Sequence, residues 1–321
     1  MSANRLEWVR RLYPMDPAHR VSREQTDRSV SPSGSTETTG QIKMNKTSFN
    51  QRLDLAWSYS QSLVCIGLDP DIDKIPERFR TAEHPFFAFN REVIDATHDL
   101  VCAYKPQIAF YSALGAEADL ALTINYIRQR APRALVILDA KRSDVGNTAK
   151  AYAQEAFVRY GADAVTVNPY MGDDSIFPFI QRAEYGAVVL CRTSNSGARD
   201  FQDLIVNGIP LYQYVAQHAA NRWNALKNLV LVVGATYPAE MNVLRQSHPN
   251  IPFLVPGIGQ QGGDLEATLS AGLDAEGQGL LISSSRAIIY AGDGSGAAIR
   301  EAAKELRNLI NELRGEKVQD A

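Results

Sequence analysis

The sequence is poor in the residues that build disulfide scaffolds and zinc sites. Its 321 residues include three cysteines and five histidines. Cys65, Cys102 and Cys191 sit in apolar runs far apart in the sequence. An odd count without framework spacing argues against a disulfide scaffold and favours a reducing compartment, so we expect a cytoplasmic protein. The histidines have no ligand spacing, and no metal site is expected.

Three further absences exclude other classes of protein. Lys and Arg total 33 against 36 Asp and Glu, so the formal net charge is −3 and no broad basic field exists for nucleic acid. No run of eighteen apolar residues occurs, which predicts no membrane-spanning helix and no membrane partner. No GxGxxG pattern follows the first apolar run, which argues against a dinucleotide-binding fold.

Residues 1–43 differ in composition from the rest of the chain. The stretch 21–41 is rich in Ser, Thr and Gly and has almost no apolar residues, so it cannot bury enough surface to offset its ordering entropy. Interspersed acidic residues and the lack of an apolar core argue against a transit or secretory peptide. We expect 1–43 to be a disordered extension, with room for a short helix at 6–13 and an alternative start at Met44, and 44–321 to be one catalytic domain.

From residue 44 onward, short apolar runs alternate with longer amphipathic stretches. The runs are four to six residues long, rich in β-branched residues and nearly continuously apolar, which is typical of parallel strands buried on both faces. Eight such units in one chain of this length predict an α/β fold, a (β/α)₈ TIM barrel, over an open doubly wound sheet. The predicted strands are 63–68, 100–105, 134–139, 163–168, 187–192, 229–234, 252–256 and 279–283.

Helices are expected between these strands because apolar residues recur there at three-to-four spacing. An extra helix over 47–62 precedes the first strand and could cover the N-terminal end of the barrel. The predicted helices that follow are 84–98, 117–131, 145–161, 212–228, 237–248, 263–274 and a long closing helix within 295–315.

Unusual polar residues collect at the predicted C-terminal ends of the strands, where barrel enzymes place their active sites. Asp139 and Lys141 are two apart on one strand, so both point to the barrel mouth. Lys105 ends the neighbouring strand, and Asp144 follows Lys141. One such pair could be a surface ion pair, but four charged residues converging on one mouth favour catalysis. Other strand-end polar residues are Asp69, Gln107, Thr193, Ser194 and Arg286.

The last two strands predict a phosphate site. The segment PGIGQQGG at 256–263 has four glycines in eight residues, so its backbone N–H groups can approach an anion. The helix after it offers a positive N-terminal end. Arg286, after the eighth strand, can hold two phosphate oxygens. Together they indicate a phosphorylated small-molecule substrate.

These segments resemble the orotidine 5′-phosphate decarboxylase family, in its second bacterial subfamily. LDAKRSDVGNTAKAYA is similar to the family signature D-x-K-x-x-D followed by a helix, and GLDPD, YKPQIAFY, VNPYMGDDSI, CRTSNSG, PGIGQQGGD and SSSRAIIYA occur in the family's order. The resemblance covers about residues 47–313. It departs at Ser143, where the subfamily often has Gly, and in the N-terminal extension.

The resemblance implies a role for each site residue. The catalytic group would be Lys141, as proton donor to C6 of the pyrimidine, with Asp139 beside the departing carboxylate and Lys105 and Asp144 completing an alternating network. The chain would be a homodimer in which Asp144 and Thr148 reach the partner's site. The substrate orotidine 5′-monophosphate would be bound, without metal or cofactor, by Asp69, Gln107, Thr148, Thr193, Ser194, Pro256, Gln261 and Arg286.

Three alternatives stay open. A related D-x-K-x-x-D barrel acts on a phosphosugar with Mg²⁺, although the hydroxyls and amides of CRTSNSG suit a hard metal poorly. A Schiff-base aldolase would use Lys105 or Lys141 as nucleophile. A catalytically inactive nucleotide-binding protein would be expected to have lost one of the four charged residues. All members of this tetrad are present: Lys105, Asp139, Lys141 and Asp144.

Overall fold

Eight parallel strands form a closed barrel in the computed structural model, which describes residues 47–258 and 263–319, with side chains to 315. The strand order around the barrel is β1-β10-β9-β8-β5-β4-β3-β2, so the first and last strands pair and close the sheet. The (β/α)₈ prediction is therefore confirmed. The barrel strands are β1 Val64–Leu68, β2 Ala103–Pro106, β3 Leu135–Arg142, β4 Ala164–Val167, β5 Gly186–Arg192, β8 Leu229–Val233, β9 Phe253–Val255 and β10 Leu280–Ser284.

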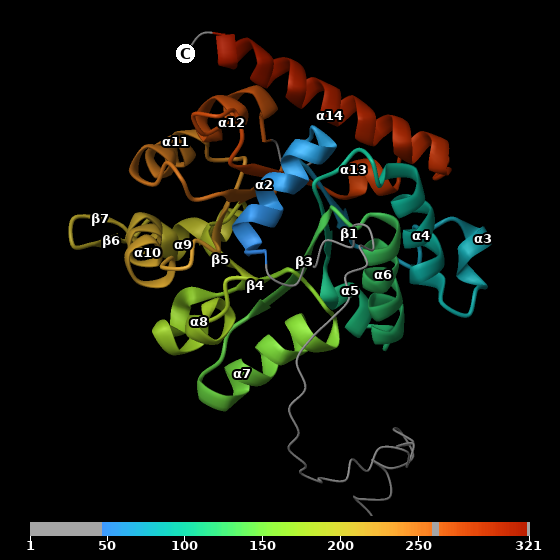
Figure 1. Ribbon diagram of the computed structural model, residues 1–321, viewed down its shortest axis with the longest axis horizontal. Helices are drawn as coiled ribbons and strands as arrows, with labels where there is room; N and C mark the ends of the chain where they lie inside the picture. Colours follow the sequence, from blue (N-terminus) through green and yellow to red (C-terminus); the bar gives the residue numbers. More distant parts are fainter. Residues whose placement is uncertain (1–46, 259–262, 320–321) are drawn as a thin grey trace, which may run out of the picture. The chain divides into compact units, whose positions relative to one another are not determined.

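The strands form where the sequence is apolar on both faces. Every residue of β1, β4 and β8 is buried, because one face points into the barrel and the other is covered by helices. Figure 1 shows the helices arranged as a ring around the strands. The longer helices are α4 Pro85–Thr97, α6 Glu117–Arg130, α7 Gly146–Gln154, α8 Asp173–Ile180, α10 Leu211–His218, α11 Pro238–Ser247, α12 Leu265–Gly272 and α14 Gly296–Gln319.

The extra helix before β1 is α2 Phe49–Ser60, and it lies at the N-terminal end of the barrel as predicted (Figure 1). Ser48 and Gln51 form a capping box that starts the helix. The ring of Phe49 packs where Gly186 begins β5, and a side chain at that position would overlap the ring. Arg52 forms an ion pair with Asp163, just before β4. These contacts attach α2 to the strand starts.

Several elements were not predicted. Helix α8 has only eight residues and contains Pro178, so its apolar pattern extends over too few residues to predict a helix. The segment between β5 and α10 contains α9 Arg199–Gln202 and a two-stranded hairpin, β6 Ile205–Val206 and β7 Ile209–Pro210. The remaining short helices are α3 Glu77–Arg80, α5 Ile108–Ser112 and α13 Arg286–Ile289, and α7 and α10 each end in a π-helical turn, at Glu155–Arg159 and Ala219–Trp223.

The predictions for residues 1–43 and for a start at Met44 lie outside the described residues. The three cysteines are free thiols, and all are buried. Cys65 lies in β1, Cys102 precedes β2 and Cys191 lies in β5. Within the residues that the structure describes, no helix is both long and apolar enough to cross a membrane.

Candidate active site

Asp139 and two lysines form an ion-paired cluster at the C-terminal ends of β2 and β3. Lys105 Nζ donates to Asp139 Oδ2 at 3.1 Å, and Lys141 Nζ donates to Asp139 Oδ1 at 2.7 Å. Lys105 and Asp139 are buried, whereas the Lys141 side chain is 50% exposed. The structure brings together these three of the four charged residues that were predicted to converge. Half of the Lys141 side chain is therefore open to solvent, while its ammonium is held by the buried Asp139 carboxylate.

Thr166 is a member of this cluster that sequence reasoning missed. Its hydroxyl donates to Asp139 Oδ1 at 2.8 Å and accepts from the backbone N–H groups of Ala140 and Lys141, each at 2.9 Å. A threonine within the apolar run 163–168 looks like an ordinary β-branched strand residue. The hydroxyl sets the orientation of the Asp139 carboxylate and also holds the backbone of Lys141.

The backbone at Lys141 is unusual because this residue has a φ of +46°, in the left-handed region. The pairing of β3 with β4 shifts register between Leu138 and Arg142, at the same place. A left-handed conformation costs a side-chain-bearing residue on the order of 1 kcal/mol or more and persists only where the surroundings enforce it. The two N–H groups held by Thr166 enforce it here, and the irregularity aims Lys141 back at Asp139.

The charges of the cluster stabilise one another. Burial raises the pKa of the Asp139 carboxyl, but Lys105, Lys141 and the hydrogen bonds from Lys141 and Thr166 outweigh it and lower this pKa to about 2. Burial lowers the pKa of the Lys105 ammonium, but Asp69 and Asp139 outweigh it, so its pKa lies above the ordinary value. Asp139 and Lys105 are therefore both charged at neutral pH.

Asp69 and Gln107 flank the cluster. Asp69 follows β1, and its Oδ1 is buried without a hydrogen-bond partner among the described residues. An unpartnered carboxylate oxygen is a suitable acceptor for a ligand hydroxyl. Gln107 pairs through its backbone with Asp139, and its side chain accepts from Ala109 N at 3.3 Å, capping α5. Both residues are placed at the barrel mouth as the sequence predicted.

Asp144 and Thr148 do not join the lysine cluster within this chain. The Asp144 carboxylate accepts from the N–H of Val145 at 2.8 Å, and Thr148 is exposed on α7. The structure holds one chain, so their predicted reach into a partner's site stays a prediction.

Thr193 and Ser194 follow β5 and differ in how their hydroxyls are used. Thr193 Oγ1 accepts from Gln202 Nε2 at 2.8 Å and donates to Asn195 Oδ1 at 2.7 Å. The Ser194 hydroxyl makes no hydrogen bond to the described residues, whereas its carbonyl accepts from Thr236 Oγ1 at 3.4 Å. Of the two predicted contacts, Ser194 has the hydroxyl that is free for a ligand.

The predicted phosphate site is described in part. Pro256 follows β9, and its carbonyl accepts from Ala235 N at 2.9 Å. The backbone of Gly257 is in the left-handed region, with φ +100°. Its carbonyl accepts from Gly263 N at 3.2 Å, so a hydrogen bond joins the two ends of the glycine-rich loop. Gln261 lies outside the described residues. Arg286 is exposed and begins α13 after β10, and among the described residues it forms no ion pair.

The helix after the glycine-rich loop has a charged cap of its own. The helix after the glycine-rich loop, α12, is already capped by the Asp264 carboxylate, which accepts from Ala267 N at 3.1 Å. This negative charge occupies the helix N-terminus that was expected to attract phosphate.

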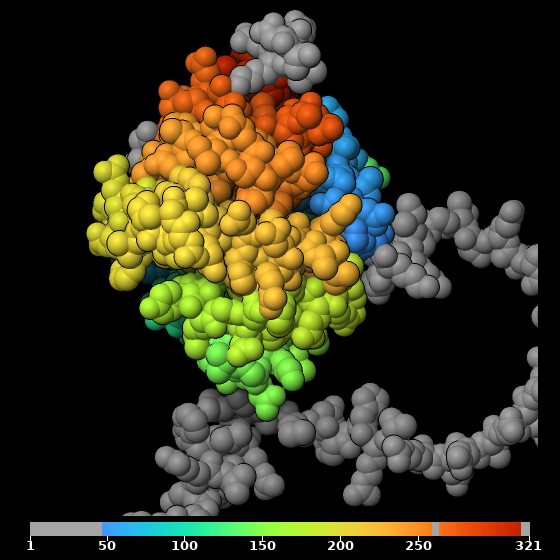
Figure 2. All heavy atoms as spheres, turned by 90° about the vertical axis from the view of Figure 1, so that its left-hand side faces the viewer, coloured from blue at the N-terminus to red at the C-terminus, as the bar shows by residue number. Residues whose placement is uncertain are grey.

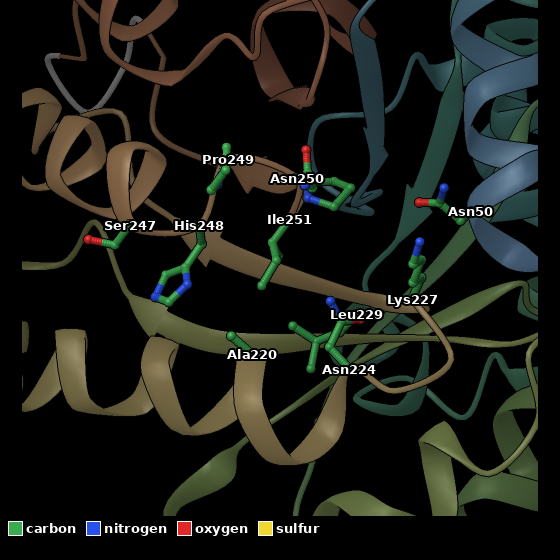
Figure 3. Close-up of a pocket in the computed structure, with 11 residues that line it drawn as sticks. Asn50, Ala220, Asn224, Lys227, Leu229, Ser247, His248, Pro249, Asn250 and Ile251 are labelled. Carbon is green, nitrogen blue, oxygen red and sulfur yellow. The ribbon is translucent and has the colours of Figure 1, made fainter.

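A separate cavity lies at the opposite end of the barrel. It has a volume of about 430 Å³ and is lined by residues that precede β8 and β9, with Asn50 from α2. Figure 3 shows Lys227, His248 and Asn250 around it. It contains no residue of the Lys105–Asp139–Lys141 cluster. No group of three or more His, Cys, Asp or Glu side chains among the described residues has the arrangement of a metal site.

Known proteins resemble this chain over the whole barrel. The family described as orotidine 5′-phosphate decarboxylase / HUMPS matches residues 62–301. The orotidine 5′-phosphate decarboxylase of Cellvibrio japonicus is 58% identical over 271 residues, covering 83% of this chain and 99% of that protein. That of Cupriavidus taiwanensis is 52% identical over 268 residues, covering 83% and 98%. The solved structure of Leishmania donovani OMP decarboxylase has a TM-score of 0.73 at 40% identity, covering 84% of this chain and 99% of that one.

Proposed function

Because the chain belongs to the orotidine 5′-phosphate decarboxylase / HUMPS family, we propose that it converts orotidine 5′-monophosphate to uridine 5′-monophosphate and CO₂, the last step of UMP biosynthesis. The observation that carries this proposal is the hydrogen-bonded Lys105–Asp139–Lys141 cluster at the barrel mouth. It offers an exposed ammonium held in place by a buried carboxylate, beside a free ribose-type acceptor at Asp69.

The reaction needs a proton at the carbon that loses CO₂. The bond between C6 of the pyrimidine and its carboxylate carbon breaks, CO₂ leaves, and the electron pair stays on C6. Lys141 Nζ carries a positive charge that stabilises this pair, and it then transfers a proton to C6. No electron acceptor is required, so the proposal includes no cofactor. Solvent can return the proton to Lys141 after the product leaves.

Asp139 has two roles in this scheme. Its carboxylate keeps both lysines charged and holds Lys141 in one position, through the 2.7 Å contact. It also lies where the substrate carboxylate would approach Lys141. The repulsion between the two carboxylates is relieved as CO₂ leaves, which lowers the barrier from the substrate side.

The remaining residues bind parts of the substrate away from the breaking bond. Asp69 and Gln107 lie on the ribose side, Thr193 and Ser194 on the pyrimidine side, and Pro256 flanks the site. Arg286, with Gln261, would hold the phosphate through a charge-assisted contact. Binding energy from ribose and phosphate can then orient the base for reaction.

We also propose a homodimer in the cytoplasm, with Asp144 and Thr148 from one subunit completing the site of the other. In this chain both side chains avoid the cluster, which leaves them available to a partner. A second Asp beside Lys141 would make the network alternate Lys, Asp, Lys, Asp. Its negative charge would favour the charged form of Lys141.

The alternatives fit the site less well. Both oxygens of Asp139 are taken by ammonium groups, so a Mg²⁺ ion there would have to displace two cations. Lys105 is buried and its pKa is above the ordinary value, which leaves little of the neutral amine that a Schiff base needs. Nothing in the described tetrad indicates a lost catalytic function.

A direct assay tests the proposal. Purified protein is mixed with orotidine 5′-monophosphate, and loss of the substrate's ultraviolet absorbance is followed with and without a chelator. We expect turnover that the chelator does not change and that Lys141→Ala reduces by at least about 1,000-fold. No turnover by the parent protein would refute the proposal, and activity lost in chelator would favour the metal-dependent alternative. A borohydride-trapped adduct with substrate would favour the aldolase.

A further inference from the structure

Arg192 is the largest fully buried side chain among the residues that the structure describes, and it comes immediately before Thr193 and Ser194. Its guanidinium lies over the ring of Tyr237, with 3.7 Å between the guanidinium carbon and the ring centroid. Nη2 pairs with Asp203 at 3.1 Å and lies 3.8 Å from Glu240 of α11. A buried charge is costly unless it is paired, so the guanidinium depends on these two carboxylates. Arg192 thus fixes the segment after α9 against the end of β5.

Gln202, the last residue of α9, connects this buried charge to Thr193. Its Oε1 accepts from Thr193 N at 2.9 Å and from Arg192 Nη1 at 3.4 Å, and its Nε2 donates to Thr193 Oγ1 at 2.8 Å. The amide orientation follows from this network, because only the oxygen can accept from two N–H donors. Among the described residues, all hydrogen bonds of the Gln202 side chain go to Arg192 and Thr193.

This network occupies Thr193 and leaves Ser194 free. The Thr193 hydroxyl accepts from Gln202, so its proton goes to Asn195 Oδ1 at 2.7 Å. Ser194 is then enclosed from the other side by Gly234 of the segment after β8, where an added Cβ would lie 2.8 Å from Ser194 Cα. The turn is therefore held on both sides, and of its two hydroxyls only that of Ser194 makes no hydrogen bond to the described residues.

We propose that Gln202, oriented by Arg192, is a positioning residue for the reaction. It touches no substrate. It holds the turn of residues 193–195 so that Ser194 meets the pyrimidine in one orientation. This inference rests on the proposed function, because it concerns the same substrate. Figure 1 shows α9 outside the barrel beside α10, so Gln202 acts on the site from outside the ring of strands.

The test is a double-mutant cycle on kcat/KM for orotidine 5′-monophosphate. A misplaced contact of about 1 Å can cost up to about 100-fold, so Gln202→Ala is expected to lose between about tenfold and 100-fold. If Gln202 acts through Ser194, the same change in a Ser194→Ala background should cost less than about threefold, because the contact is already gone. Gln217→Ala, on the exposed side of α10, is the control and should match the parent.

Orotidine, which lacks the phosphate, separates positioning from general damage. Gln202→Ala should lower kcat/KM for orotidine by the same factor as for the full substrate, whereas Arg286→Ala should affect only the full substrate. If Gln202→Ala does not fold, Arg192→Lys takes its place, since it keeps the charge for Asp203 and Glu240 but shortens the reach to Gln202.

Each outcome has one meaning. Losses that multiply in the double variant, or a Gln202→Ala protein as active as the parent, would overturn the inference while leaving the proposed function intact. A parent protein that does not turn over the substrate would instead refute the proposed function. Buffered losses in the Ser194→Ala background support the inference.

Discussion

At the scale of single residues, Asp139 connects most of the site. It receives hydrogen bonds from Lys105, Lys141 and Thr166, which come from three different strands. One carboxylate therefore determines the distance between two ammonium groups and the position of the strand end that carries Lys141. The ionisation of Asp139 therefore affects both the arrangement of the site and the stability of the fold.

The first prediction concerns pH. The pKa of Asp139 is about 2 in the folded protein, below its ordinary value of 3.8, so ionisation stabilises the fold. This stabilisation is complete above about pH 4 and is lost as pH falls towards 2. The parent protein should therefore lose about 2 kcal/mol more unfolding free energy than Asp139→Asn between pH 6 and pH 2.5. Denaturant titrations at both pH values measure the difference, and a constant gap would contradict it.

The second prediction concerns Arg286. Arg286→Ala should reduce kcat/KM for orotidine 5′-monophosphate by the equivalent of about 2–5 kcal/mol, because the phosphate loses its charged partner. The reaction of phosphate-free orotidine should hardly change. Arg307→Ala, on α14, removes an equal charge away from the site and serves as the control. Equal losses with both substrates would show that Arg286 is not the phosphate ligand.

At the scale of elements, the strands could be predicted and several connections could not. A strand buried on both faces is apolar at every position, which is why β4 and β8 were predicted to within one residue at each end. The second run was predicted to begin at residue 100, but Leu100 and Val101 belong to a buried connection and β2 begins at Ala103. Both residues are apolar in either role, so composition cannot separate a turn that packs in the core from the strand that follows it.

The same reasoning explains which site residues were found. Asp139, Lys141 and Lys105 are conspicuous because charge interrupts an apolar run at a strand end. Thr166 interrupts nothing, and its hydroxyl gains a role only through the left-handed backbone at Lys141, which no local pattern specifies. Gln202 lies in a polar connection, where its bond to Thr193 depends on the path of α9.

The third prediction concerns the attachment of α2 and α6 to the barrel. Asp163 is buried before β4. It accepts from Val136 N at 2.7 Å and forms ion pairs with Arg128, at 2.7 Å, and with Arg52. Asp163→Ala removes the shared partner of two arginines and should cost about 3 kcal/mol of unfolding free energy. The kcat of the folded fraction should stay unchanged, because Asp163 lies at the other end of the strands from Lys141.

Asp54→Ala provides the control for this measurement, since Asp54 lies on the exposed face of α2, the helix that carries Arg52. It should change the unfolding free energy by less than about 0.5 kcal/mol. An Asp163→Ala protein as stable as this control would show that the buried ion pairs do not hold the helices. Loss of kcat in folded Asp163→Ala would show instead that the two ends of the barrel are coupled.

At the scale of the whole molecule, the fourth prediction tests whether two chains share each site. Lys141→Ala and Asp144→Ala should each be nearly inactive alone. In a mixed dimer, one site receives both lesions and the other receives none. Random exchange makes half of the dimers mixed, so activity should recover to roughly a quarter of the parent value.

The mixture is prepared by co-expression with two different tags, and the doubly tagged dimers are purified before assay. Purified mixed dimers should then have about half of the parent activity, because one site in two is intact. Mixed dimers that remain inactive would mean that Asp144 serves its own chain. A protein that runs as a monomer during size-exclusion chromatography at assay concentration would exclude the shared site directly.

The three buried thiols can report when the barrel opens. Cys65, Cys102 and Cys191 are fully enclosed, and burial raises the pKa of Cys65 and of Cys191 to about 12. Thiolates are the form that reacts with alkylating reagents, so the closed barrel is protected twice, by exclusion and by protonation. The rate of labelling at neutral pH therefore measures how often the strands around each thiol separate. Because β1 and β5 lie on different sides of the closed sheet, comparing their labelling rates tells whether the barrel opens at one seam or comes apart as a whole.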